Sequence, residues 1–187
     1  MAEIASVQKK KNLSATAQGV ATVISIAAAV AVPQAFHWLG KISGAGTAPG
    51  IVFSPMHFPV IIAGLLAGPV VGALSGLLGP AASHFLSGMP SGVQLPLMMA
   101  ELFGYGLAAG LLRKSNMPLF AKTAVAMLAG RVLRTLLCAV FFYILGNAKV
   151  APLGIWLSVP QCLPGIVLQL AFIPLFVYRV ENFGKEE

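Results

Sequence analysis

The sequence contains no aspartate, and its only acidic residue between Glu3 and Glu181 is Glu101. Catalysis by a pair of carboxylates therefore lacks its second group. The GxSxG and HExxH motifs of hydrolases are missing, and so is the P-loop that cradles the phosphates of ATP. We therefore expect no enzymatic activity. Any ATP hydrolysis that supports this chain must take place on another polypeptide.

Cysteine is scarce as well. Cys138 and Cys162 are the only two, and their positions show no pairing pattern, so we expect free thiols. The three histidines and seven methionines do not form a recognisable metal-ligand spacing. The sequence thus predicts no metal site and no cofactor.

Charged residues are rare, and apolar residues are abundant. Of 187 residues, 58% are hydrophobic and 9% are charged, and the mean hydropathy is +0.88. A soluble domain of this composition would lack the polar residues to cover its surface. The chain is therefore predicted to be an all-α integral membrane protein.

The length allows six spans of about 20 residues each within a single membrane domain over 1–187. We place the spans at residues 15–36, 56–66, 70–86, 96–112, 119–146 and 162–179. The second is short, because a helix of about 11 residues rises only about 16 Å across a hydrocarbon core of roughly 30 Å. Neighbouring helices must shield it, or loop must supplement it.

The net charge of +7 indicates topology here and not nucleic-acid binding. Eight basic residues fall on one side of the predicted spans and two on the other, namely Lys9, Lys10, Lys11, Arg113, Lys114, Lys122, Arg179 and Lys185 against Lys41 and Lys149. Under the positive-inside rule both termini are cytoplasmic. We expect a multi-pass protein of a prokaryotic plasma membrane.

Three charged residues lie away from the ends of the predicted spans, where a charge is costly unless it is paired or faces a cavity. Arg131 and Arg134 are three positions apart and share a helix face. Glu101 can neutralise only one of them, so a site formed by all three keeps one positive charge and favours an anionic ligand. Alternatively, Glu101 and one arginine form a structural ion pair while the other arginine snorkels towards the cytoplasm.

Uncharged polar residues near the outer half add further candidates. His57, at the outer end of the second span, is suited to bond a ligand, cap the helix or bond a loop carbonyl, and the sequence does not decide among these. Gln169 lies well inside the sixth span, where its amide needs a partner. Asn147 follows the fifth span.

Small residues recur every four positions in the first span, at Ala17 and Ala21 and again at Ala27, Ala31 and Ala35. This spacing favours close helix approach, either within the chain or with a separate membrane subunit. A similar series at Gly64, Gly68, Gly72 and Gly76 is more typical of internal packing.

Several short stretches together carry a family resemblance over nearly the whole chain. They are Ser54-Pro55-Met56-His57-Phe58-Pro59-Val60, Ala63-Gly64-Leu65-Leu66-Ala67-Gly68-Pro69, Gly88-Met89-Pro90, Met99-Ala100-Glu101, Ala129-Gly130-Arg131 and Pro164-Gly165-Ile166-Val167-Leu168-Gln169. In this order they resemble the substrate-binding S components of energy-coupling factor (ECF) transporters, which are importers of the ABC type.

The resemblance implies a six-helix subunit that captures a vitamin or related micronutrient outside the cell. It also implies three partners, a coupling transmembrane subunit and two cytoplasmic ATPases. The alanine stripe of the first span is similar to the family's AxxxA docking motif. The surplus positive charge makes pantothenate the first expectation, with queuosine or a precursor, cobalamin, pyridoxine and haem open. The alternative is a self-sufficient secondary transporter or channel for a small anionic solute.

Overall fold

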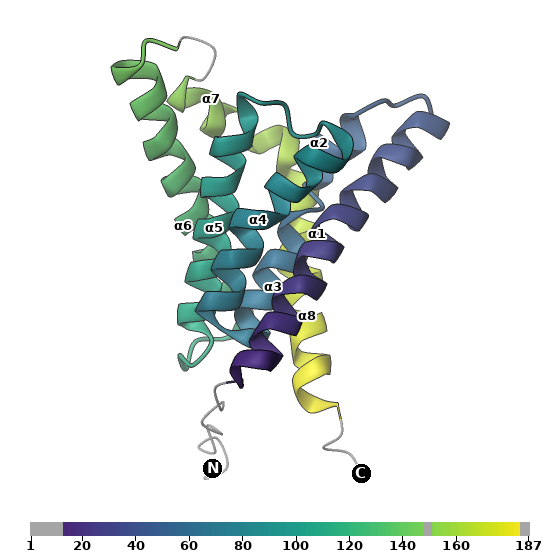
Figure 1. Ribbon diagram of the computed structural model, residues 1–187, viewed down its shortest axis with the longest axis vertical. Coiled ribbons are helices and arrows are strands. Elements are labelled where there is room, and N and C mark those ends of the chain that lie inside the picture. Colours follow the sequence, from purple (N-terminus) through teal and green to yellow (C-terminus); the bar gives the residue numbers. More distant parts are fainter. Residues whose placement is uncertain (1–12, 148–150, 184–187) are drawn as a thin grey trace.

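The structure is a computed structural model that describes residues 13–147 and 151–183, and its regular secondary structure in these ranges is helical (Figure 1). The helices are α1 (Ala15–Ile42), α2 (Ala48–Phe53), α3 (His57–Ala67), α4 (Pro69–Ser87), α5 (Gln94–Leu112), α6 (Leu119–Ala139), α7 (Pro152–Leu157) and α8 (Val159–Asn182). Lys9, Lys10, Lys11, Lys149 and Lys185, which entered the charge argument, lie outside the described residues.

Six segments of the described chain are long and apolar enough to cross a membrane, which confirms the predicted fold class. Two of them are composite. The second runs over Ala48–Ala67 and joins α2 to α3, so a short helix supplements the span that looked too short. The fifth joins α6 to a π-helical turn over Val140–Ile144.

Helix α1 differs from its prediction, because it continues to Ile42 instead of ending at residue 36. The segment 37–54, which lies between the first two predicted spans, therefore holds the end of α1 and all of α2. The sequence pattern does not reveal α2, because this helix has only six residues and none of them is buried.

Backbone geometry explains where the second span breaks and reverses. Ser54 ends α2 with a φ of 45°, in the left-handed region, and Pro55 follows it. Gly68 separates α3 from α4 with a φ of 109°, a value that L residues rarely adopt. Pro69 then occupies the first position of α4, where its missing N–H costs nothing. The result is a tight reversal between two membrane helices.

Glycines let α3, α4 and α5 pack with their backbones in contact. A Cβ atom on Gly72 would overlap the backbone of Gly106, and the reverse is equally true. Gly64 lies against the same Gly106 carbonyl. Close backbone approach of this kind is typical of membrane helices with small residues at their interface. The glycine series is thus a packing surface within the chain.

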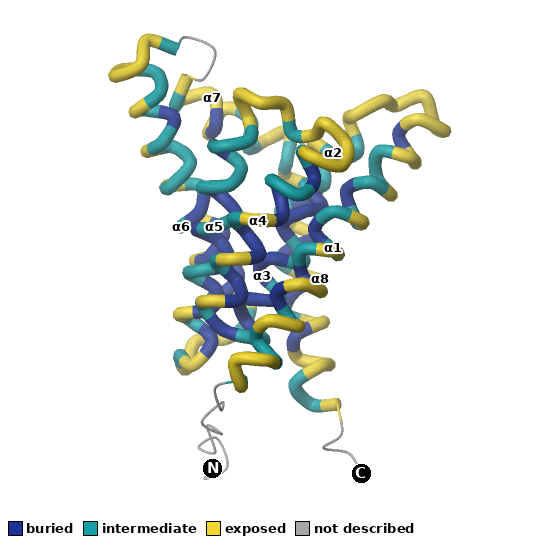
Figure 2. The backbone as a smooth tube through the Cα atoms, in the orientation of Figure 1, coloured by how far each residue is buried: buried dark blue, intermediate teal, exposed yellow. Residues whose placement is uncertain are grey.

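The main apolar core lies in the half of the bundle where α1 begins and α8 ends. Its largest buried side chains come from α3, α5 and α8 and include Ile61, Leu65, Tyr105 and Ile173. Figure 2 shows the buried backbone gathered in this half, whereas the opposite end, with α2 and α7, is mostly exposed or half-buried. The opposite end therefore has room for a cavity.

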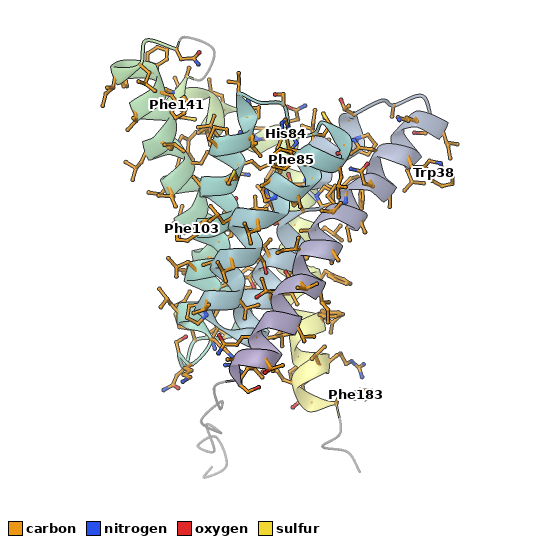
Figure 3. The ribbon with its side chains drawn as sticks, viewed as in Figure 1. Trp38, His84, Phe85, Phe103, Phe141 and Phe183 are labelled. Atoms are coloured by element: carbon orange, nitrogen blue, oxygen red, sulfur yellow. The ribbon has the colours of Figure 1, made fainter. Side chains whose placement is uncertain are left out.

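Helices α1 and α6 diverge towards the end that carries α2 and α7 (Figure 1). The outward faces are apolar, as expected for helices in lipid. Trp38, for example, is 64% exposed near the end of α1 and points away from the bundle (Figure 3). The start of α1 and the end of α8 share the other end, and the cytoplasmic location of that end stays a prediction.

Candidate functional site

A cavity of about 450 Å³ opens between the diverging helices, and each helix from α1 to α8 contributes to its wall. Its volume lies in the range of small-molecule sites. The lining residues are Pro33, His37, Thr47, Gly50, Ile51, Ser54, Pro55, Met56, His57, Ser83, Met89, Pro90, Gln94, Met98, Glu101, Arg131, Arg134, Ile155, Ser158 and Cys162. Glu101, Arg131 and Arg134, the three charged residues away from the ends of the predicted spans, are all among them.

Glu101 and Arg134, both in the wall of this cavity, form an ion pair. The Nη1 atom of Arg134 donates to Oε2 of Glu101 at 2.6 Å. The Nη2 atom of Arg134 donates to Oε1 of Gln94 at 3.0 Å. Glu101 is only 2% exposed. A carboxylate buried to this degree needs such a partner.

Tyr105 is hydrogen-bonded to the other carboxylate oxygen of Glu101. Its hydroxyl donates to Oε1 of Glu101 at 2.8 Å, and its side chain is fully buried. The two residues are one helical turn apart on α5. Both oxygens of Glu101 are therefore engaged within the protein. Whether Glu101 also contacts a ligand stays a prediction.

Gly130 allows α6 to bring its arginines to this cluster. A Cβ atom at Gly130 would overlap the ring of Tyr105 and the carbonyl of Glu101. The helices α5 and α6 therefore approach closely just before Arg131. Because Arg131 and Arg134 share a face of α6, both then line the cavity.

Arg131 differs from Arg134 in its surroundings. It is half-buried in the cavity wall, and within residues 13–147 and 151–183 its guanidinium forms no ion pair. With Glu101 balanced by Arg134, these three side chains carry one net positive charge. Glu101 thus pairs with Arg134 while Arg131 borders the cavity, and a ligand site formed by all three charges stays a prediction.

His57 is the first residue of α3 and is 5% exposed. Its ring packs edge-on against Tyr105, with the ring centroids 4.9 Å apart, and it also borders the cavity. His57 thus lies between the lining and the support network. Whether it contacts a ligand stays a prediction.

Gln169 and Asn147, the other two predicted site residues, are not among the residues that line the cavity. Gln169 is 1% exposed on α8, and its Nε2 donates to the carbonyl of Phe53 at 3.4 Å. Asn147 follows the π-helical turn, and its backbone N–H donates to the carbonyl of Phe141 at 3.0 Å. Neither residue lines the cavity.

Tyr105 and three cavity methionines were missed by the sequence argument. The signal for Tyr105 was its spacing of four from Glu101 on one helix. Met56, Met89 and Met98 supply polarisable thioethers to the cavity wall, but nothing in their spacing along the chain predicts that they meet. Among the described residues, no cluster of three or more His, Cys, Asp or Glu side chains is placed to hold a metal ion.

The alanine stripe of α1 divides into two parts. Ala27 and Ala31 are exposed, whereas Ala17 and Ala21 are half-buried. Another face of α1 packs into the bundle, where Ser25 donates to the carbonyl of Pro59 at 3.2 Å. Ala27 and Ala31 therefore lie on an exposed face of α1, where they present small side chains.

Comparison with known proteins finds a family but no individual relative. No curated protein and no solved structure matches the chain. The family model described as "ECF transporter, substrate-specific component" matches residues 14–177, which is most of the chain. The chain therefore belongs to the substrate-specific components of ECF transporters.

Proposed function

We propose that this chain captures a small organic anion, a vitamin or related micronutrient, in the cavity between α1 and α8 for an ECF-type importer. The observation that carries the proposal is the surplus positive charge of Arg131 in a cavity of about 450 Å³. The family indicates a substrate-binding subunit, and the positive charge of Arg131 favours a negatively charged ligand.

Electrostatics supports an anionic ligand. Glu101 already accepts from Arg134 and from Tyr105, so it adds little attraction for a cation. Arg131 presents a guanidinium, whose planar fork matches a carboxylate in bidentate geometry. In a site surrounded by apolar helices, an unbalanced cation is stabilised when a ligand brings the opposite charge.

Pantothenate fits these conditions best among the expected ligands. It carries one carboxylate and is small, and the cavity volume is at the lower end of the range for ligand sites. Pyridoxine and queuosine bring no carboxylate for Arg131. Cobalamin and haem are much larger molecules, and the cavity volume favours smaller ligands.

We further propose that the chain works with a coupling transmembrane subunit and two cytoplasmic ATPases in a prokaryotic plasma membrane. The exposed Ala27 and Ala31 support α1 as the docking helix, because small side chains let another helix approach closely. The basic residues near the start of α6 support a cytoplasmic location for that end of the bundle.

The alternative is a secondary transporter or channel that works alone. A proton-coupled version would need a carboxylate free to take up and release protons, and Glu101 is the only acidic residue away from the ends of the spans. Its two engaged oxygens suit a structural support better than a relay. The geometry therefore favours the binding subunit.

Calorimetric titration of the detergent-solubilised protein with pantothenate tests the proposal. We expect Arg131→Ala to weaken binding by at least about tenfold, because it removes a charged hydrogen-bond donor. Arg131→Lys should retain part of the affinity. The matched control is Arg179→Ala, which removes an exposed cation at the opposite end of the bundle. Unchanged binding by folded Arg131→Ala, or tighter binding of neutral pyridoxine than of pantothenate, would contradict the proposal.

A further inference from the structure

A second cavity, of about 350 Å³, lies at the end of the bundle where α1 begins, away from α2 and α7 (Figure 1). Its wall comes from the start of α1, from the reversal between α3 and α4, and from the end of α5. We call it the α4–α5 pocket. Within the described ranges it shares no lining residue with the cavity between the diverging helices, so it is a separate site.

Close packing of α5 on the reversal between α3 and α4 fixes the shape of this pocket. A Cβ atom on Gly110 would overlap the backbone of Gly68 and Pro69. A Cβ atom on Gly68 would lie 3.9 Å from Nη1 of Arg113, so the guanidinium is held beside the reversal. The backbone contacts therefore form the pocket before any ligand arrives.

Two basic side chains give the pocket its charge. Arg113 is 9% exposed, Lys114 is exposed, and both line the wall. Helix ends of both signs also meet here, because α3 and α5 end at the pocket and α4 begins there. Each helix end carries about half an elementary charge, and opposite ends offset each other. The two full positive charges of the side chains therefore dominate.

Neighbouring charged groups do not reverse this sign. Lys122 on α6 is buried, and its Nζ donates to the carbonyl of Arg113 at 3.2 Å. Burial lowers the pKa of the Arg113 guanidinium, and the carboxylate of Glu181 on α8 offsets part of this lowering. Together with Lys114, these side chains are three cations and one anion. The region keeps two positive charges and favours an anionic ligand.

The rim of the pocket is apolar and faces outward. Val70 at the start of α4 is 56% exposed, Leu111 near the end of α5 is 66% exposed, and both also line the pocket. Exposed apolar side chains on membrane helices contact acyl chains. The pocket also lies where two spans end, which is the depth of the lipid headgroups. An amphiphile with an anionic head therefore matches both parts of the site.

We propose that the α4–α5 pocket binds the phosphate group of an anionic phospholipid, with Arg113 and Lys114 as its cationic contacts. The acyl chains lie along Val70 and Leu111. A guanidinium can bind two phosphate oxygens at once, and a lysine adds a point charge. Basic pockets at the ends of membrane helices suit anionic headgroups. This lipid site is independent of the ligand in the other cavity.

Native mass spectrometry of the detergent-solubilised full-length protein tests the inference with two lipids of identical acyl chains. We expect anionic phosphatidylglycerol to be retained about tenfold more strongly than zwitterionic phosphatidylcholine. Lys114→Gln should weaken the retention of phosphatidylglycerol by about fivefold. The matched control is Arg179→Gln, which removes an exposed cation on α8 outside the pocket and should retain the lipid as the wild type does.

Inorganic phosphate distinguishes a headgroup from a free anion. At a concentration equal to that of the lipid it should leave phosphatidylglycerol bound, because it gains nothing from the apolar rim. Displacement of the lipid by phosphate would overturn the lipid assignment.

Three other results would also overturn the inference. Equal retention of the two lipids would mean that the pocket does not select an anion. Equal losses in Lys114→Gln and Arg179→Gln would reduce the effect to diffuse surface charge. Unchanged lipid retention by Lys114→Gln, with lost co-purification of the coupling subunit, would assign the pocket to a protein partner.

Discussion

Arg134 on α6 donates to Glu101 on α5 at 2.6 Å, and both residues line the cavity. The pair neutralises the one acidic residue in the cavity lining and leaves Arg131 as the surplus cation. Its neighbour Tyr105 belongs to the main core. The net charge of the cavity wall is therefore set by a network that also holds the bundle together.

Breaking the ion pair should destabilise the protein. Glu101→Ala leaves Arg134 without its carboxylate in a mostly apolar setting, and removal of one partner of a buried pair costs about 3–5 kcal/mol. Because the Arg134 side chain is 27% exposed, we expect the free energy of unfolding to fall by about 3 kcal/mol, the lower end of this range. Denaturant unfolding in detergent micelles measures it. Wild-type stability of Glu101→Ala would show that the pair contributes nothing.

Removing the Tyr105 hydroxyl tests the support network separately. Tyr105→Phe keeps the ring in the core but leaves Oε1 of Glu101 without its donor, at an expected cost of about 1–3 kcal/mol. Tyr178→Phe, at an exposed position on α8, is the matched control and should be neutral. The same unfolding assay applies, and equal stabilities of the two variants would mean that the hydroxyl is dispensable.

The backbone contact between α4 and α5 should not tolerate a methyl group. Gly106→Ala introduces a Cβ atom that overlaps Gly72, and overpacking of this kind costs about 1–3 kcal/mol or more. Thermal unfolding with a fluorescent dye in detergent should show a lowered midpoint. Gly19→Ala on α1, where a Cβ atom has open space, should unfold as the wild type does. A normal midpoint for Gly106→Ala would refute the close contact.

Docking on α1 predicts a loss of assembly without a loss of ligand binding. Ala31→Leu places a large side chain on the exposed stripe and should prevent co-purification with the coupling subunit. Ala171→Leu makes the same change on an exposed position of α8 and should assemble normally. Affinity purification followed by gel analysis gives the answer. Normal assembly of the Ala31→Leu variant would show that the coupling subunit does not dock on this alanine stripe.

The sequence predicted the six spans because apolar length alone determines them. The sequence also predicted that Glu101, with its single negative charge, can neutralise only one of the two arginines. It could not choose Arg134 over Arg131, because both share a helix face and the choice depends on how α5 and α6 approach at Gly130.

Other features were beyond sequence reasoning for physical reasons. Helix α2 has no buried stripe to reveal it. The partner of Gln169 is a backbone carbonyl at Phe53, 116 positions away, and a backbone acceptor leaves no mark in the sequence. Residues that bond to backbone are the hardest to assign from side-chain chemistry alone.

Native mass spectrometry of protein purified gently from its own cells, with release and identification of the bound molecule, tests the central claim most directly. The account predicts a small organic anion on the wild-type protein and its loss from the folded Arg131→Ala variant. A neutral or cationic ligand, or an anion that Arg131→Ala retains in full, would contradict it.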